Sequence, residues 1–321
     1  MKMEKKTLGV VLATFNGEKY IEQQLLSLAN QTLRPDMIVI SDANSKDSTI
    51  DIARRVLDKI NIEYKILTSD KQLSVRENFQ KALENIDTYY IFFCDQDDVW
   101  VNNKIEITIH YMKKFKAVLA FTNARLVDAN LNSTKRDNLW ERIQYNVTYE
   151  YQYYKENDNT FISELLKHNV VTGMCMCITN ELKAFILPFS IHGIHDSWIA
   201  LNAISHGNVI AINKKLVLYR QHELNVIGAN NSGINKKIEK SKKYVSNIKN
   251  RLELIKDWKF KNCICQDEVD KYIDFLAFRL DLIEKNEKLF SIVMELRMYK
   301  KYEVRSTSII LKDSIMRVLN K

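Results

Sequence analysis

The sequence predicts an α/β protein with a mainly parallel β-sheet and a C-terminal helical appendage. In the first third of the chain, short apolar runs alternate with segments whose apolar residues recur every three or four positions. After Gly233 the chain contains no Gly or Pro, and apolar stripes at helical spacing recur. Strands and helices that alternate over such short segments are typical of βαβ units and a parallel sheet. Apolar stripes without helix breakers indicate amphipathic helices that need a packing partner.

The first 104 residues predict four strands with three helices between them. We expect buried strands at 8–13, 37–41, 62–67 and 89–94. The intervening helices follow from apolar residues at helical spacing: Ile21, Leu25 and Leu28, then Ile52, Val56 and Ile60, then Val75, Phe79, Leu83 and Ile86. In such sheets the ligand crevice lies outside the carboxyl ends of the strands.

The rest of the chain is predicted in two parts. Strands are expected near 118–122, 170–178 and 216–219, with a polar, Tyr-rich loop at 130–159 whose length is typical of a functional loop. Beyond it, two helical stripes consist of Val245, Ile248, Leu252 and Ile255, and of Val269, Ile273, Leu276, Leu280 and Ile283. We therefore divide the chain into a sheet domain at 1–230, with halves 1–104 and 105–230, and a helical segment at 231–321.

The composition is that of a globular protein with a core. The chain has 321 residues, of which 46% are hydrophobic and 27% charged. Its apolar runs, such as 89–94, are too short to span a bilayer. The run after the basic N-terminus is also short, so we interpret it as a first strand rather than a signal peptide.

The five cysteines argue against a disulfide framework, because their number is odd and the chain is large. They include two Cys-x-Cys pairs, which lack the usual spacing of zinc ligands. We expect free thiols and a cytoplasmic protein.

The net charge of +8 is concentrated in the C-terminal segment. Residues 231–321 hold 21 Lys and Arg against 13 Asp and Glu, and the remainder holds 27 of each kind. This predicts an anionic partner, a membrane surface rather than nucleic acid, with peripheral attachment to the inner face of the cell membrane. The alternatives are a solvated helical face, or apolar stripes that pair two subunits in a homodimer, and the sequence does not separate them.

An acidic cluster follows the fourth predicted strand. Asp95, Asp97 and Asp98 lie within four residues, and carboxylates this close repel one another. A hard divalent cation with oxygen ligands would resolve the repulsion. The alternative, that Asp98 caps the helix near Lys104, explains only one of the three. The cluster therefore predicts a metal site.

A phosphate-binding role for such a metal is expected because Gly-rich phosphate loops are absent. A divalent cation would then neutralise a diphosphate. Thr14 and Asn16 follow the first strand and Asp42 ends the second, so these residues would line the same crevice.

Six blocks of sequence carry a family resemblance. They are LATFNGEKYIEQQLLSLANQT, ISDANSKDST, FFCDQDDVW, TGMCM, HDSWIAL and LYRQHELNVIG, in that order over residues 8–228. Together they resemble the family 2 glycosyltransferases of GT-A fold, and within that family the bacterial rhamnosyltransferase-like members. The C-terminal segment is not part of the resemblance.

The resemblance implies inverting transfer of one sugar from a nucleoside-diphosphate sugar, with Mn²⁺ or Mg²⁺ as cofactor. dTDP-rhamnose or a UDP-sugar would be the donor, and a bacterial surface glycan or a polyprenyl-linked glycan the acceptor. By position, the resemblance assigns Thr14, Asn16 and Asp42 to the nucleoside, Arg76 to the base and phosphates, Asp95 to the ribose and metal, and Asp97 and His222 to the metal. The alternatives are a surface Arg76 and a structural His222.

The resemblance also assigns Asp196 as the catalytic base. A carboxylate would take the proton of the acceptor hydroxyl as the sugar carbon is attacked, and a metal-bound diphosphate would be a stabilised leaving group. His195 is expected to orient Asp196, and Asp98 and Arg220 are supporting residues. The alternative is that Asp196 only caps a helix. Trp100 and Trp198 are interpreted as core residues.

The sequence departs from the family at Ala43. The family usually has Asp-Asp-Gly-Ser where this chain has Asp-Ala-Asn-Ser at 42–45. Asn44 tolerates left-handed backbone angles, as Gly does, but Ala43 cannot accept a hydrogen bond from the N3–H of a pyrimidine. Either Asp42 or a backbone carbonyl makes that contact, or the base preference is relaxed.

Two other functions remain open from the sequence. One is a catalytically impaired protein of the same fold that binds a nucleotide sugar or a glycan, which Ala43 favours and the intact acidic residues disfavour. The other is a nucleotidyltransferase, which would be expected to carry a Gly-rich loop after the first strand. Here that loop contains only Gly17.

Overall fold

The computed structural model describes residues 7–222, 234–262, 267–284 and 313. The chain divides into two compact units. The sheet unit comprises 1–158, 170–189 and 194–225, and the helical unit comprises 159–169, 190–193 and 226–321. The division of the chain at residue 230, and of its first part at residue 104, stays a prediction.

The sheet unit is built on one mixed sheet. Its strands are β1 (Leu8–Thr14), β2 (Met37–Asp42), β3 (Glu63–Leu67), β4 (Tyr90–Asp95), β5 (Val99–Trp100), β6 (Ala117–Val127), β7 (Ser133–Asn138), β8 (Tyr151–Tyr154), β9 (Met176–Thr179) and β10 (Asn208–Arg220). The order is β3-β2-β1-β4-β9-β6-β10-β5, with β7 beside β6 and β8 beside β10. β1 to β4 are parallel where they pair, as are β6 and β10, whereas β9 runs antiparallel between β4 and β6. The parallel pairing expected of the first four strands is confirmed.

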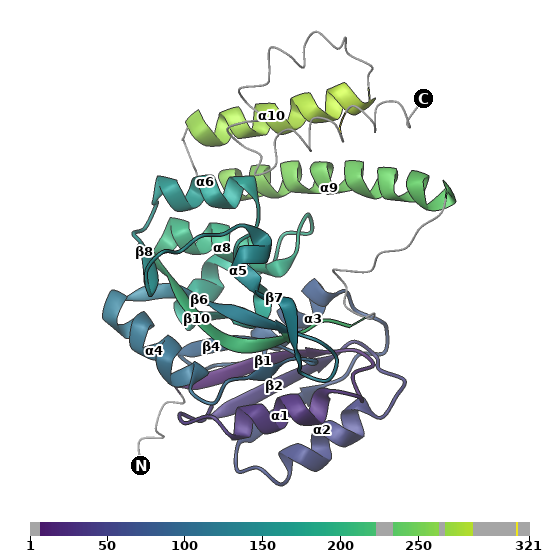
Figure 1. The fold of residues 1–321 in the computed structure, drawn as a ribbon, viewed down its shortest axis with the longest axis vertical. Coiled ribbons are helices and arrows are strands. Elements are labelled where there is room, and N and C mark those ends of the chain that lie inside the picture. Colours follow the sequence, from purple (N-terminus) through teal and green to yellow (C-terminus); the bar gives the residue numbers. More distant parts are fainter. Residues whose placement is uncertain (1–6, 223–233, 263–266, 285–312, 314–321) are drawn as a thin grey trace. The chain divides into compact units, whose positions relative to one another are not determined.

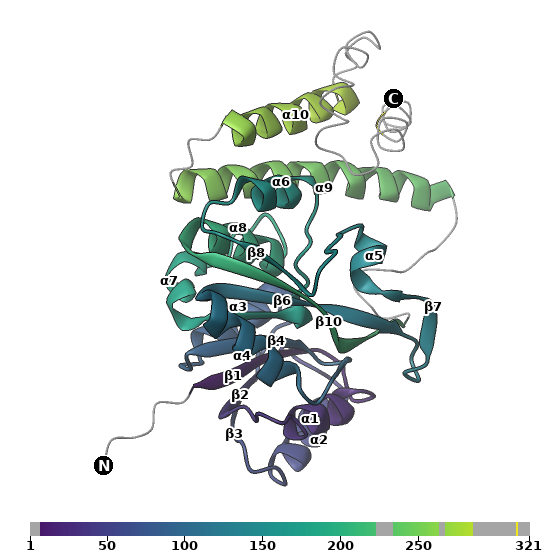
Figure 2. The same ribbon diagram turned by 60° about the vertical axis from the view of Figure 1, so that its left-hand side comes forward.

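Helices cover both faces of this sheet. They are α1 (Ile21–Ala29), α2 (Thr49–Leu57), α3 (Val75–Glu84), α4 (Lys104–Phe115), α5 (Leu139–Ile143), α7 (Lys183–Ile186) and α8 (His195–His206). Figures 1 and 2 show α1 and α2 together on one side of β1 and β2, with α3 and α8 on the other. Short 3₁₀ turns at Gly173–Cys175 and Asn180–Leu182 flank β9.

The first four predicted strands and three predicted helices are confirmed, with ends displaced by a few residues. Two later predictions are partly wrong. The apolar run at 170–178 forms a turn followed by the short β9, and the strand expected at 216–219 begins at Asn208. The longer β10 pairs with β6 through irregular register shifts, which the local sequence does not reveal.

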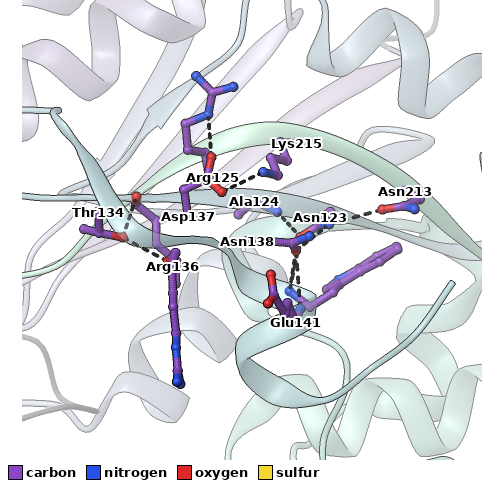
Figure 3. Close-up of polar contacts among 12 residues, drawn as sticks. Asn123, Ala124, Arg125, Thr134, Arg136, Asp137, Asn138, Glu141, Asn213 and Lys215 are labelled. Atoms are coloured by element: carbon purple, nitrogen blue, oxygen red, sulfur yellow. Dashed lines mark hydrogen bonds and ion pairs between the residues drawn. The ribbon is translucent and has the colours of Figure 1, made fainter.

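The loop expected at 130–159 contains β7, α5 and β8. Asn138 caps α5 by accepting a hydrogen bond from the Trp140 backbone N at 3.1 Å. The Asn123 side chain donates to Asn138 Oδ1 at 2.9 Å and to Asn213 Oδ1 at 3.2 Å, which ties three strands together (Figure 3). These partners lie far apart in sequence, so a local pattern could not predict the ordered segment.

The helical unit contains α6 (Asn159–Lys167), α9 (Ile234–Lys261) and α10 (Asp267–Glu284). The predicted stripes are confirmed where described, because most of their residues are buried: Val245, Ile248, Leu252, Ile255, Val269, Leu276, Leu280 and Ile283. Arg251 of α9 donates to the Leu166 carbonyl at the end of α6, at 2.7 Å, and to the Tyr272 hydroxyl of α10, at 2.8 Å. One arginine therefore joins the three helices.

Within the described ranges, none of the helices is both long and apolar enough to cross a membrane. Cys94, Cys175 and Cys177 are free and buried, as expected. Cys263 and Cys265 lie outside the described residues, as do the end of the LYRQHELNVIG block after His222 and most of the chain after residue 284.

Candidate active site

The predicted site residues of the first strands lie at one edge of the sheet. Thr14 pairs with Asp42 in the β1–β2 register, and Ala13 pairs with Asp95 in the β1–β4 register. The carboxyl ends of these parallel strands therefore bring the Thr14, Asp42 and Asp95 backbones together, as the crevice argument predicts.

Asp42 holds the loop after β2. The carboxylate is only 2% exposed, and it accepts hydrogen bonds from the Thr14 hydroxyl at 2.8 Å, the Ser45 backbone N at 2.8 Å and the Ser45 hydroxyl at 2.5 Å. Both oxygens are thus engaged within the protein. This disfavours Asp42 as the sole contact to a base, and the nucleoside role of Asp42 and Thr14 stays a prediction.

The two neighbouring loops at this edge are joined through Asn16. Its backbone N donates to the Ser45 hydroxyl at 2.8 Å, and its side-chain oxygen accepts from the Lys46 backbone N at 2.9 Å. Asn16 has φ 47° and Asn44 has φ 68°, so both adopt the left-handed conformation that Asn tolerates. Ala43 is buried, and its N donates to the Thr14 carbonyl at 2.9 Å.

Gln96, inside the acidic block, fastens that block to the first loop. Its side-chain oxygen accepts from the Phe15 N and its amide donates to the Phe15 carbonyl, both at 2.9 Å. A Cβ on Gly17 would lie 2.1 Å from the Gln96 oxygen, so any other residue there would displace the Gln96 amide from Phe15. The sequence analysis missed this contact, although an isolated Gly after the first strand was its signal.

The three carboxylates after β4 differ in environment. Burial, and then the charges of Asp97 and Asp196, raise the pKa of Asp95 to about 7. Burial, and then Asp97 and Asp95, raise the pKa of Asp98 well above its usual range. Asp98 Oδ1 accepts from the Arg220 backbone N at 3.0 Å, and its buried Oδ2 has no partner among the described residues. Because Asn103 is the residue before α4, Asp98 does not cap that helix.

Asp97 is paired with His222. The imidazole Nε2 lies 2.8 Å from Asp97 Oδ2, and the ring packs on Tyr20 with 4.9 Å between ring centroids. The structure therefore brings together two of the three predicted metal ligands, which lie 125 residues apart in the sequence. Among the described side chains, no three His, Cys, Asp or Glu converge closely enough to hold a metal ion.

Arg220 anchors the acidic loop at residues 95–98 by hydrogen bonds. Its guanidinium donates to the Asp97 carbonyl at 2.7 Å, to Gln23 Oε1 at 2.6 Å and to the Ala129 carbonyl, and it lies 4.5 Å from the Tyr20 ring centroid. A guanidinium group is planar and has five N–H donors, so one buried arginine can donate to several acceptors at fixed positions. Arg220 is a positioning residue, and its contacts with Tyr20 and Gln23 were not predicted.

Lys104 is a second buried cation that the sequence analysis did not assign. Its ammonium donates to the Met174 carbonyl at 2.6 Å and lies 3.6 Å from the Trp100 ring centroid. Burial lowers its pKa to about 8. It links α4 to the turn before β9. Trp100 and Trp198 are buried, which confirms them as core residues.

Asp196 lies in the first turn of α8. The carboxylate is largely buried, accepts from the Ser197 N at 2.6 Å and interacts with the charge of Asp95. Since the residue before α8 is Ile194, Asp196 is inside the helix rather than at its cap. The site of the predicted base therefore belongs to the same electrostatic cluster as the DQDD block.

His195 does not hydrogen-bond to Asp196. Its ring packs against Phe79 at 4.3 Å and Phe93 at 5.8 Å between centroids, and neither ring nitrogen has a partner among the described residues. Burial lowers its pKa to about 3. A Cβ on Gly173 would lie 2.7 Å from His195 Nε2, so this glycine in the TGMCM block makes room for the ring. The His195 side chain is therefore a neutral ring that packs in the core next to Phe79 and Phe93.

Arg76 lies half-buried in the first turn of α3, and its role near the base stays a prediction. Asn78, two residues later, is buried and donates to the Thr14 carbonyl at 3.0 Å. Asn78 thus joins α3 to the end of β1. A polar residue on the apolar face of a helix was the signal for it.

Comparison with known proteins identifies the family of the chain. The model of glycosyl transferase family 2 matches residues 9–176. The dTDP-rhamnosyl transferase RfbG of Shigella flexneri is 29% identical over 228 residues, covering 68% of this chain and 74% of RfbG. The Escherichia coli glucosyltransferase WfgD, which transfers from UDP-Glc to α-D-GlcNAc-diphosphoundecaprenol, is 25% identical over 214 residues, covering 66% of this chain and 75% of WfgD.

Solved structures show the same fold. S. aureus TarS 1–349 in complex with UDP-GlcNAc has a TM-score of 0.61 at 13% identity, covering 98% of this chain and 89% of that one. The mannosyltransferase PcManGT of Pyrobaculum calidifontis, in complex with GDP-Man and Mn²⁺, has a TM-score of 0.54 at 14% identity, covering 99% and 88%. The GT-A fold expected from the sequence is confirmed. The chain belongs to glycosyl transferase family 2 and is a glycosyltransferase of bacterial glycan biosynthesis.

Proposed function

We propose that this enzyme is a metal-dependent inverting transferase that moves one sugar from a nucleoside-diphosphate sugar to a surface-glycan or polyprenyl-linked glycan acceptor. The observation that carries the proposal is the electrostatic cluster of Asp95, Asp97 and Asp196, in which the neighbouring charges contribute to the raised pKa of Asp95. A donor, a cation and an acceptor hydroxyl could meet there. RfbG and WfgD use dTDP-rhamnose and UDP-glucose, which supports a pyrimidine-nucleotide donor.

The acidic block offers the type of ligand that Mn²⁺ or Mg²⁺ binds, and two of the proposed ligands, Asp97 and His222, lie in contact. Asp98 has a buried oxygen without a partner, Asp95 and Asp98 have pKa values raised by burial and mutual repulsion, and carboxylate oxygens are the ligands that these cations prefer. Asp97 and His222 would hold the metal, and Asp95 would contact the metal and the ribose. When bound, the cation would offset the charge of the leaving diphosphate.

The protein's own groups would do the rest of the chemistry. Asp196 would accept the proton of the acceptor hydroxyl as that oxygen attacks the sugar carbon. Arg220 and Gln96 would hold the acidic loop still while the donor binds.

We also propose peripheral contact of the 231–321 segment with an anionic membrane surface, where lipid-linked acceptors lie.

Thermal-shift measurements test the donor and metal together. A ligand that binds only the folded state raises stability by RT ln(1 + [L]/Kd), so a nucleotide at a hundred times its Kd adds about 2.7 kcal/mol. We expect UDP or dTDP with Mn²⁺ to raise the melting temperature of the wild type, and Asp97→Ala to remove the Mn²⁺-dependent part. Asp137→Asn, at an exposed ion pair on β7, is the matched control. Equal shifts with and without Mn²⁺ would contradict metal dependence.

A catalytically impaired binding protein is the second candidate, favoured by Ala43. It predicts the same thermal shifts but no release of nucleoside diphosphate from any donor. Turnover measurements therefore separate the two.

A further inference from the structure

The charge of the helical unit is divided between its two long helices. α9 carries ten basic and three acidic residues, a formal charge of +7, whereas α10 carries two basic and six acidic residues, a formal charge of −4. Residues 285–321 carry a further formal charge of +5, which brings the C-terminal segment to +8, and α9 is the more basic of the two described long helices.

The exposed side of α9 is basic and ends in an aromatic residue. Among its described side chains, the exposed ones are all cationic, neutral polar or aromatic: Lys243, Ser246, Asn247, Lys249, Asn250, Lys256, Phe260 and Lys261. Lys249, Lys256 and Phe260 recur at intervals of seven and four residues, so they line up along one side of the helix. We call these three residues the α9 stripe.

The formal charge of +7 already counts the three acidic residues of α9, so their ion pairs offset only part of its basic charge. Glu253 is paired with Lys256 at 2.9 Å, and Asp257 accepts the Ser190 hydroxyl at 2.8 Å. Neither is among the exposed residues of the helix. The exposed residues of α10, in contrast, are Asp267, Lys271 and Asp274. The two helices thus present surfaces of opposite character.

The exposed side chain of Phe260 favours a lipid surface over other anionic partners. Its side chain is 88% exposed, at the last turn of α9 and beside Lys259 and Lys261. An exposed aromatic residue among lysines is typical of interfacial helices, whose apolar side chains enter the boundary between headgroups and acyl chains while the lysines attract anionic headgroups. A duplex nucleic acid would use the lysines but leave Phe260 in water.

We propose that the α9 stripe is a membrane-docking surface for anionic phospholipid, with Phe260 as the inserting residue. The inference deepens the proposed use of a lipid-linked acceptor by naming the residues that meet the bilayer. It is tested without donor or acceptor, so its failure would leave the proposed transfer reaction intact.

Co-sedimentation of the full chain with vesicles is the test. We expect binding to vesicles of phosphatidylcholine with about a third phosphatidylglycerol, and weak binding to vesicles of pure phosphatidylcholine. Binding should be lost when NaCl is raised from about 0.1 M to 1 M, because the screening length then falls from about 10 Å to 3 Å. Each Lys near an anionic surface contributes about 1 kcal/mol, or about fivefold. Lys249→Glu with Lys256→Glu should therefore weaken binding at least about 25-fold. Phe260→Ser should weaken binding at low salt, because it removes the side chain that enters the bilayer.

Matched substitutions complete the design. Lys271→Glu makes on the acidic helix the charge change that Lys249→Glu or Lys256→Glu alone makes on α9, so it is compared with each single stripe variant. Tyr149→Ser removes an aromatic side chain that is 76% exposed in the sheet unit. Both should bind vesicles as the wild type does, and all variants should keep the wild-type melting temperature. The proposal is overturned if the wild type does not bind, if Lys271→Glu weakens binding as much as the stripe variants, or if an oligonucleotide binds the stripe and vesicles do not.

Discussion

His195 shows how burial decides what a residue type does. A histidine next to a proposed catalytic carboxylate suggests a hydrogen-bonded partner, yet its ring lies among Phe79 and Phe93 without a polar contact among the described residues. Because burial lowers its pKa to about 3, it stays neutral at every pH at which the enzyme would work. Its contribution is the shape that supports the first turn of α8.

This environment predicts a defined acid sensitivity. The unfolded chain binds a proton on His195 below about pH 6.5, whereas the folded protein does so only near pH 3, so stability falls as pH drops between these values. At pH 5 the cost is about 2 kcal/mol. His195→Phe should remove this loss while keeping transfer activity.

Urea unfolding of wild type and His195→Phe at pH 7.5 and pH 5 measures the effect. The variant should lose about 2 kcal/mol less than the wild type on acidification, and His195→Ala should be destabilised at both pH values by the cavity it creates. Equal pH slopes in wild type and His195→Phe, or loss of transfer in His195→Phe, would show that the imidazole has a polar role.

At the scale of elements, the end of β10 is fixed to the start of α1 and to the loop after β4. Arg220 makes this connection through Asp97, Gln23 and Ala129, and its backbone N also binds Asp98. His222 follows two residues later and reaches Asp97 from the same segment. The residue therefore sets the position of both members of the Asp97–His222 pair.

We expect Arg220→Lys to destabilise the folded protein. A lysine cannot satisfy the three acceptors in one plane, so buried oxygens lose their donors and the free energy of unfolding should fall by about 2–4 kcal/mol. Arg142→Lys, at a pair with Gln221, is the control and should cost less than about 1 kcal/mol. A near-neutral Arg220→Lys in chemical denaturation would contradict the positioning role.

The same scale shows where sequence reasoning succeeds. The strands and helices of the first hundred residues follow from apolar spacing because their burial is periodic. The contacts of Gln96, Asn78, Lys104 and Arg220 do not follow, because each joins segments distant in sequence: their partners are Phe15, Thr14, Met174 and Gln23. Gly17 and Gly173 are visible signals of such contacts, but they identify a close approach without identifying the partner.

At the scale of the whole molecule, the candidate site could be predicted because a parallel sheet gathers strand ends. Blocks separated by a hundred residues, at 95–98 and 195–196, interact through charge as the family resemblance implies. The hydrogen bonds of Asp42 with Thr14 and Ser45 could not be predicted. A run of polar residues after a strand has the same sequence pattern whether its side chains bind a ligand or their own loop. The opposite charges of α9 and α10 became clear only with the helix bounds.

The central claim is that Asp196 and the Asp97 site perform sugar transfer. The most direct measurement is the release of nucleoside diphosphate, and of glycosylated acceptor, from a panel of UDP- and dTDP-sugars by wild type, Asp196→Asn and Asp137→Asn, each with Mn²⁺ or with EDTA. Wild type and Asp137→Asn should turn over only with the metal, and Asp196→Asn should lose at least about a hundredfold, the scale of general-base catalysis. Full turnover by Asp196→Asn, or by the wild type in EDTA, would contradict the account.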